Sequence, residues 1–254
     1  MSEPVVRTPL SGWPHKELLY ETIDDGRIAI ITLNRPDRMN ASDPGMARRW
    51  VEAWTTFADD DNCWVAIVTG AGDRAFSAGQ DLKIRAELEE QGGDAPYRHR
   101  RQTVVPIGEK LGCWKPTIAA INGYAIAGGW SVAQHCTFRI AAEHAEMNIA
   151  EARWNQGAGF VATLTRLVGI GTALEFCIMG DRRFTAQRAY EVGLVNKVVP
   201  KERLMDEAID WARTIGRMAP RSVRNFNELV HRCYSMSTPE AQAFASALEY
   251  NLRG

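Results

Sequence analysis

Apolar residues along the chain follow two periods, one typical of strands and one typical of helices. Two short apolar stretches within residues 17–33 flank Asp24, Asp25 and Gly26, which predicts a β-hairpin. Residues 42–58 place their apolar side chains three and four positions apart behind a polar start signal, which predicts a helix.

The alternation continues through the next third of the chain. The pattern predicts strands at 64–68, 117–121 and 138–142, and helices at 97–114 and 129–136. A strand, helix, strand order is what parallel βαβ units require. We therefore expect an α/β fold with helices stacked on a mainly parallel sheet.

After Phe160 the pattern becomes mostly helical. Helices are predicted at 161–168, 171–180, 185–192, 201–217 and 221–234, with Leu194–Val199 as a strand. We therefore divide the chain into an α/β core over residues 1–200 and a helical region over residues 201–254.

The composition describes an ordinary globular protein. Hydrophobic residues make up 45% of the 254 positions and charged residues 24%. The formal net charge is -1, so no global field favours nucleic acid or an anionic membrane as a partner. The basic cluster Arg98, His99, Arg100 and Arg101 is interpreted as a solvated helix face.

Targeting and metal signals are absent from the sequence. No window approaches about 18 uninterrupted apolar residues and no signal peptide is evident, so the expected location is the cytoplasm. The five cysteines are scattered without a CxxC pair, and no histidine stands at metal-ligand spacing. They are interpreted as reduced thiols, and no metal is expected.

Two small-residue turns follow predicted strands and open helices. They are TGAGDRAFSAGQDL (69–82) and NGYAIAGGW (122–130). Glycines let backbone amides approach a ligand, and the first amides of a helix have no internal acceptor, so each turn could donate an N–H to an anion. The alternative is a tight connection that uses glycine only for its dihedral angles. The P-loop motif is absent and the dinucleotide fingerprint is incomplete.

The chain resembles the crotonase family, the enoyl-CoA hydratases and isomerases. The resemblance is carried by ITLNRPDRMNA (31–41), VTGAGDRAFSAGQDL (68–82), KPTIAAINGYAIAGG (115–129), Glu151, TRLVG (165–169) and AYEVGLVNKVVP (189–200). It implies a spiral of ββα units with a C-terminal helical trimerisation region. It also implies an acyl-CoA thioester substrate, with coenzyme A entering as part of the substrate and no separate cofactor.

Within this resemblance, the backbone amides of Gln80 and Gly128 form an oxyanion hole for the thioester carbonyl. Family hydratases use two glutamates, and here Ser131 and Glu151 stand at those positions. A serine hydroxyl can orient water but is a poor base. The pair of Ser131 with a single glutamate resembles the hydroxycinnamoyl-CoA hydratase-lyases, while a single glutamate also fits the enoyl-CoA isomerases.

Further substrate contacts are expected around these groups. The resemblance implies contacts from Arg38, Ala78, Asp81 and Gly129, with Arg38 near the CoA phosphates or adenine or, alternatively, solvated. Trp130 and Trp154 flank the acid-base pair in sequence and could line the acyl pocket, or they could be ordinary core residues.

Two other functions compete with the hydratase. The sequence GWSVA (129–133) falls one glycine short of a nucleophile elbow, which would make Ser131 the nucleophile of a (thio)esterase. A non-catalytic acyl-CoA-binding protein is the third possibility. The resemblance further implies a homotrimer or a hexamer, and the sequence ends before a helix that family members usually have, so we expect that helix to be absent or the chain to be cut.

Overall fold

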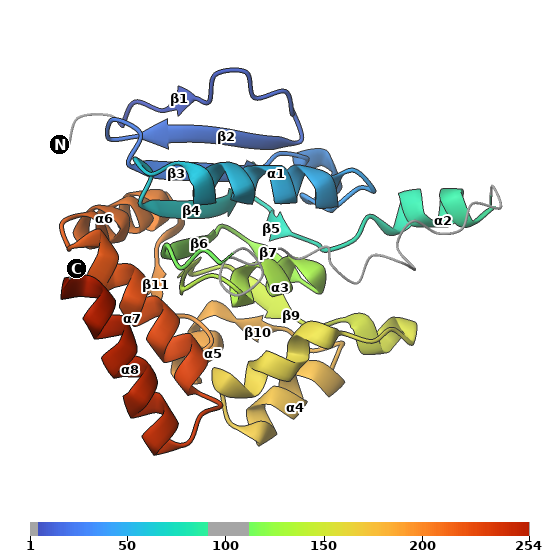
Figure 1. Cartoon of the computed structure of the whole chain (residues 1–254). Coiled ribbons are helices and arrows are strands. Elements are labelled where there is room, and N and C mark those ends of the chain that lie inside the picture. The colour runs from blue at the N-terminus through green and yellow to red at the C-terminus, as the bar shows by residue number, and fades with distance from the viewer. Residues whose placement is uncertain (1–4, 91–111, 254) are drawn as a thin grey trace.

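The computed structural model describes residues 5–90 and 112–253, and within these ranges the strands form two sheets (Figure 1). The larger sheet has the order β1-β2-β3-β4-β6-β8-β11. Its strands are β1 (Thr8–Pro9), β2 (Leu18–Ile23), β3 (Ile28–Leu33), β4 (Val65–Gly70), β6 (Thr117–Ile121), β8 (Phe138–Ala142) and β11 (Lys197–Val199). The β2–β3 pair is the predicted antiparallel hairpin, and the strands from β3 to β11 run parallel.

The smaller sheet has the order β10-β9-β7-β5. Its strands are β5 (Ala75–Ser77), β7 (Tyr124–Ile126), β9 (Glu146–Asn148) and β10 (Phe184–Thr185). Successive strand pairs along the chain send one strand to each sheet, as in β4 with β5, β6 with β7, and β8 with β9. This repetition is the spiral of ββα units, so the predicted α/β fold class is confirmed.

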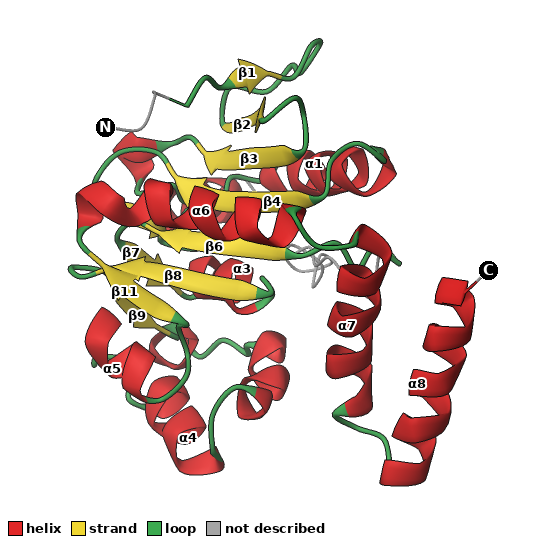
Figure 2. Cartoon of the chain, turned by 90° about the vertical axis from the view of Figure 1, so that its left-hand side faces the viewer, coloured by secondary structure: helices red, strands yellow, loops and turns green. Residues whose placement is uncertain are grey.

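Helices cover both faces of the larger sheet (Figure 2). The α-helices are α1 (Met46–Asp59), α2 (Leu82–Glu90), α3 (Gly128–Gln134), α4 (Ile170–Ile178), α5 (Ala186–Glu191), α6 (Leu204–Gly216), α7 (Pro220–Cys233) and α8 (Thr238–Arg253). The 3-10 helices are η1 (Pro36–Arg38), η2 (Glu151–Trp154), η3 (Gly159–Arg166) and η4 (Lys201–Arg203).

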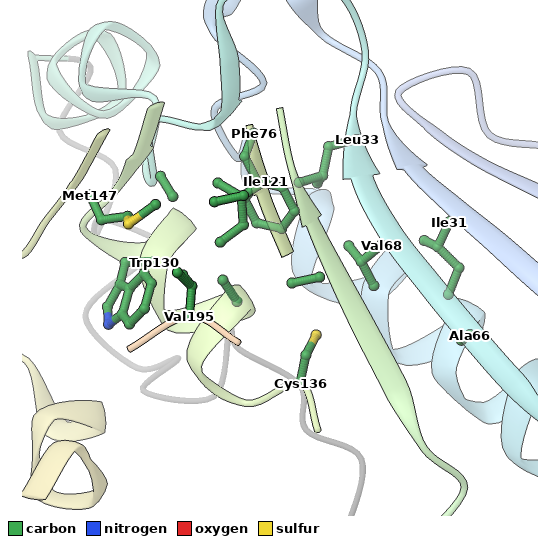
Figure 3. Close-up of a cluster of buried hydrophobic side chains, with 14 of the residues drawn as sticks. Ile31, Leu33, Ala66, Val68, Phe76, Ile121, Trp130, Cys136, Met147 and Val195 are labelled. Atoms are coloured by element: carbon green, nitrogen blue, oxygen red, sulfur yellow. The ribbon is translucent and has the colours of Figure 1, made fainter. Parts of the chain in front are cut away.

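The central strands are buried on both faces because two cores enclose the larger sheet. Ile31 and Leu33 of β3 point into the core that the sheet shares with α1, α3 and the smaller sheet (Figure 3). Ile28 and Ile30 point the opposite way, into the core beneath α6. Continuous apolar strands are what a parallel sheet covered on both sides requires.

The structure departs from the sequence expectations at several places. The helix predicted at 97–114 and the basic cluster Arg98–Arg101 fall almost entirely outside the described residues, and residues 112–114 are not helical. The predicted helix 161–168 is the 3-10 helix η3, and the strand at 194–199 is shortened to β11. Helix α2 is the helix expected to follow the first glycine turn, for which no bounds were predicted, and the bounds of α8 were not predicted either.

The predicted helical region has two parts. Helix α6 packs on the larger sheet, where Leu204, Ala208, Ile209 and Ala212 belong to the second core. Helices α7 and α8 pack on each other and stand away from the sheet (Figure 2). The division after residue 200 stays a prediction.

Candidate active site

The two glycine turns meet backbone to backbone. Gly79 has φ +83, and a Cβ added there would lie 3.0 Å from the nitrogen of Gly128 and 3.0 Å from the oxygen of Ile126. Within the described ranges, neither the N–H of Gln80 nor that of Gly128 donates a hydrogen bond. The contact therefore brings two segments that are distant in sequence together and leaves two predicted oxyanion-hole amides available to a ligand.

The backbone at Ala127 sets how the second turn enters α3. Ala127 has φ 54 and ψ -124, an unusual conformation for a residue with a side chain, and its N–H donates to the oxygen of Asn148 at 2.8 Å. Such a conformation costs on the order of 1–3 kcal/mol and tends to occur at functional sites. Two residues later, Gly129 packs against Ser77, because an added Cβ would lie 2.1 Å from the Ser77 oxygen.

Asn40 supports the first turn from the segment 34–41. Its Nδ2 donates to the oxygens of Ala71 at 2.9 Å and Ala75 at 2.7 Å. The backbone oxygen of Asn40 accepts from the hydroxyl of Ser77 at 2.9 Å, and that hydroxyl accepts from the N–H of Gly79 at 3.2 Å. Asn40 is buried with φ 54, so a short amide side chain both tolerates this backbone and crosslinks the turn.

Asp81, predicted as a substrate contact, has its carboxylate occupied by an ion pair. Oδ2 accepts from Nη2 of Arg35 at 2.9 Å, and Asp81 is 5% exposed. Its backbone oxygen accepts from the N–H of Arg85 at the start of α2. The side chain therefore anchors the residue that follows Gln80, and Arg35 is a supporting residue that the sequence interpretation did not single out.

Glu151 begins η2 with a partly buried carboxyl group. Its Oε2 is buried and has no hydrogen-bond partner among the described residues. Burial raises the pKa of this carboxyl above its ordinary value, and hydrogen bonds from the backbone of Glu151 and Ala150 oppose the rise. A carboxyl group shifted in this direction holds a proton nearer to neutral pH, which suits general acid-base work.

Ser131 lies one turn into α3 and is fully buried. Its hydroxyl has no partner within the described part of the chain, while its backbone oxygen is 2.7 Å from Nδ1 of His135. Buried polar groups are normally paired, and the exceptions often have catalytic roles. Ser131 and Glu151 thus both present an oxygen that is unpaired within the described residues, and no histidine of those residues is hydrogen-bonded to the serine hydroxyl.

Cys177 of α4 belongs to the surroundings of Glu151. Burial raises the pKa of this thiol first, and the negative charge of Glu151 raises it further. The sequence interpretation placed Cys177 only among the scattered reduced thiols, because nothing local links α4 to η2.

The remaining residues predicted to contact the substrate differ in their exposure to solvent. Trp130 is fully buried, donates from Nε1 to Oε1 of Gln134 at 2.9 Å and packs edge to face on Phe176, so it has the packing role of a core residue. Trp154 is 58% exposed and Arg38 is exposed. Ala78 is held through its N–H by the oxygen of Met39. Their substrate contacts stay predictions.

Within residues 5–90 and 112–253 no group of three or more His, Cys, Asp or Glu side chains is arranged to hold a metal ion. In the same ranges no helix combines the length and the apolar character needed to cross a bilayer.

Comparison with known proteins agrees with this architecture. The sequence profile of the family "Enoyl-CoA hydratase/isomerase" matches residues 24–253. The chain is 35% identical over 199 residues to (E)-benzylidenesuccinyl-CoA hydratase of Thauera aromatica, covering 78% of this chain and 76% of that protein. It is 36% identical over 223 residues to carnitinyl-CoA dehydratase of Salmonella arizonae, covering 87% and 83%.

Solved structures give the same relationship. An enoyl-CoA hydratase/isomerase from Mycobacterium paratuberculosis superposes with a TM-score of 0.82 at 29% identity, covering 93% of this chain and 90% of that one. The enoyl-CoA hydratase from Mycobacterium tuberculosis H37Rv gives 0.78 at 30% identity, covering 92% and 89%. The chain therefore belongs to the enoyl-CoA hydratase/isomerase, or crotonase, family of acyl-CoA enzymes.

Proposed function

We propose that this enzyme adds water to the double bond of a 2-enoyl-CoA thioester. The amides of Gln80 and Gly128 bind the thioester oxygen, Glu151 moves the proton, and Ser131 positions the water or the acyl group. The observation that carries the proposal is the carboxyl group of Glu151, whose buried Oε2 is unpaired within the described residues and whose pKa is raised by burial. Coenzyme A enters as part of the substrate, and the reaction uses no metal or nicotinamide.

The oxyanion hole acts when negative charge develops on the thioester oxygen. As water adds to C3, electrons move through C2 and the carbonyl to give an enolate, and two fixed N–H donors stabilise that charge. Loss of one such donor typically costs about 2.7–4 kcal/mol in the barrier. The Gly79–Gly128 contact supports this role because it fixes the two donors to one another without a flexible side chain.

A single carboxyl group handles both proton transfers. The Glu151 carboxylate takes a proton from water as the C3–O bond forms, and the resulting acid returns a proton to C2 of the enolate. Ser131 cannot replace a second glutamate as a base, but its hydroxyl can accept and donate hydrogen bonds to the water. Burial of Glu151 supports this double role because it brings the acid and the base form closer in stability.

The relatives favour hydration over isomerisation. One is named a hydratase and another a dehydratase of a CoA thioester. The pairing of Ser131 with Glu151 resembles the hydroxycinnamoyl-CoA hydratase-lyases, so cleavage of the hydrated product is a second outcome of the same chemistry. Double-bond isomerisation needs only Glu151 and the oxyanion hole and is the alternative reaction.

The esterase alternative lacks support from the geometry. A nucleophilic serine needs a base within hydrogen-bond reach, and the Ser131 hydroxyl has no hydrogen-bond partner among the described residues. A fluorophosphonate probe tests the point. Labelling that disappears in Ser131→Ala would support the esterase, and turnover of CoA thioesters without labelling would contradict it.

The main test is a substrate panel. Consumption of crotonyl-CoA, a 3-enoyl-CoA and hydroxycinnamoyl-CoA is followed for the wild type and for Glu151→Gln. General acid-base catalysis supplies about 10²–10⁴-fold, so the variant should lose that much kcat on the preferred substrate. Full turnover by Glu151→Gln would contradict the assignment of Glu151. Turnover of the 3-enoyl thioester alone would identify an isomerase.

We also propose that the enzyme is a homotrimer or a hexamer. Phe226 and Val230 of α7 and its C-cap residue Tyr234 lie at four-residue spacing and are 67%, 72% and 58% exposed. Such an apolar stripe on a helix pair that stands away from the sheet is typical of an interface between copies. Light scattering measures the assembly directly, and a monomer at micromolar concentration would contradict the proposal.

A further inference from the structure

Strand β9 connects the two halves of the candidate site. The oxygen of its last residue, Asn148, accepts the N–H of Ala127 at 2.8 Å, directly before Gly128. The same strand leads through Ile149 and Ala150 to Glu151. The backbone of β9 therefore fixes the entry to the oxyanion turn and the start of the segment that carries the acid-base group.

The side chain of Asn148 makes a second connection, to the turn at residues 179–183. Asn148 is 3% exposed, and its Nδ2 donates to the oxygens of Gly180 at 2.7 Å and Arg182 at 2.8 Å. An uncharged amide supplies both donors, whereas a leucine or an aspartate of similar shape supplies none. Because the site is buried, water does not readily replace these bonds, and their loss leaves the carbonyl oxygens without a donor.

This turn packs against the residues that follow Glu151. Nε of Arg153 in η2 lies 3.0 Å from Oδ1 of Asp181. A Cβ added to Gly180 would lie 3.2 Å from Cγ of Arg153, so the aliphatic stem of that arginine rests on the glycine. The ion pair is exposed and contributes little energy by itself. The stem on Gly180 is the close packing contact between this turn and η2.

We propose that Asn148 is a positioning residue that holds the 179–183 turn beneath η2 and thereby fixes the Glu151 carboxyl group relative to the oxyanion turn. The inference rests on the proposed role of Glu151 and extends it to a residue outside the reacting groups. Asn148 acts at both ends of η2, through the chain that leads into Glu151 and through the turn on which Arg153 rests. Without the Nδ2 bonds the turn loosens, η2 moves, and Glu151 gains contact with water.

The test compares two variants with a matched control. Asn148→Leu removes both donors while keeping the shape, and Gly180→Ala leaves the donors but pushes the Arg153 stem. Asp24→Asn is the control, because it removes only a solvent-exposed ion pair with Arg213, and these two residues belong to neither β9 nor the 179–183 turn. Each variant is measured for kcat and KM on the best substrate of the panel.

A second readout follows Glu151 itself. The titration of its carboxyl group is recorded as an infrared difference spectrum between each protein and the same protein carrying Glu151→Gln. We expect Asn148→Leu to lower kcat by about 10-fold or more with KM within about 2-fold, because a small misplacement of a catalytic group is costly. The Glu151 titration should move to lower pH in both variants, since solvation favours the carboxylate.

The outcomes separate this inference from the proposed function. If Asn148→Leu folds, an unchanged kcat together with an unchanged Glu151 titration in that variant overturns the inference. If it does not fold, the same result in Gly180→Ala overturns it. A shift of equal size in Asp24→Asn would also overturn it. Failure of Glu151→Gln to reduce turnover would overturn the proposed function instead, while the infrared titration still reports whether Asn148 positions the carboxyl group.

Discussion

Arg35 and Asp81 form an ion pair at the base of the Gln80 turn, with 2.9 Å between Nη2 and Oδ2 and with side chains 13% and 5% exposed. Removal of one partner from a buried pair leaves the other charge unpaired, which costs about 3–5 kcal/mol. Asp81→Asn should therefore lower the free energy of unfolding by an amount in that range and reduce kcat, because Gln80 is the preceding residue.

Denaturant unfolding and steady-state kinetics check this prediction. Asp73→Asn is the control, since it removes an ion pair with Lys201 that is exposed to solvent and that should contribute little. Equal destabilisation by the two substitutions would show that burial of the Arg35–Asp81 pair does not determine its contribution.

Gly79→Ala should damage catalysis more than folding. Gly79 and Gly72 both have positive φ, at +83 and +74, so alanine meets a similar backbone penalty at either position. Only at Gly79 does the added Cβ approach the nitrogen of Gly128, at 3.0 Å, whereas at Gly72 its nearest neighbour is Cβ of Pro36 at 3.3 Å. We expect Gly79→Ala to lose about 10²–10³-fold in kcat, the effect of disabling one oxyanion donor.

Thermal unfolding of the two glycine variants supplies the comparison. Both should lose stability to a similar extent, and Gly72→Ala should keep kcat near that of the wild type. A kcat for Gly79→Ala that matches Gly72→Ala would mean that the Gly79–Gly128 contact has no role in aligning the donors.

Glu151→Gln should stabilise the folded protein at neutral pH while it lowers the activity. The pKa of Glu151 is raised by burial, so the folded protein favours the protonated form. The wild type is consequently most stable below the unfolded-state pKa, and it loses that part of its stability as pH rises through the folded-state pKa. Glutamine resembles the protonated acid, so Glu151→Gln should be more stable than the wild type at pH 7–8 and equal to it at acidic pH.

The measurement is the unfolding free energy of both proteins between pH 4 and pH 8. The same raised pKa predicts that kcat/KM of the wild type falls, as pH decreases, at a higher pH than for an ordinary glutamate. If the difference in unfolding free energy between the wild type and Glu151→Gln did not change with pH, this would contradict the buried position of the carboxyl group.

The parts of the fold that the sequence predicts are those determined by local pattern. Strands such as β3 and β6 are apolar on both faces, so a continuous run identifies them, and the glycine turns after β4 and β6 are visible as composition. The smaller sheet was missed because strands of two or three residues, such as Glu146–Asn148, are too short for a period to be measured.

The supporting residues of the site were missed for a different reason. Asn40 and Asn148 act through bonds to backbone atoms that lie 31 to 35 and 32 to 34 positions away in the sequence. An asparagine that crosslinks distant turns has the same local appearance as one in a surface loop. The family resemblance identified Glu151 and Ser131, and only the three-dimensional contacts identify what holds them.

His231 gives a prediction for the helix pair α7 and α8. Its ring lies 6.0 Å from that of Trp114, which precedes β6 in the chain. Desolvation by the surrounding protein lowers its pKa, and the positive charges of Arg139 and Arg166, together with His135, lower it further, although His231 is itself exposed at the surface. The folded protein therefore favours neutral His231, and this stabilisation is present above the unfolded-state pKa and lost as pH falls through the folded-state pKa.

The melting temperature should thus fall between pH 7 and pH 5 in the wild type, and His231→Gln should weaken that dependence because glutamine does not titrate. His144→Gln is the matched control, since His144 is exposed like His231 but lies outside this contact. If α7 carries the interface between copies, the same loss at acidic pH will appear in light scattering as dissociation, and it will be absent in His231→Gln. A pH dependence unchanged by His231→Gln would assign the effect to other groups and leave α7 docked independently of this histidine.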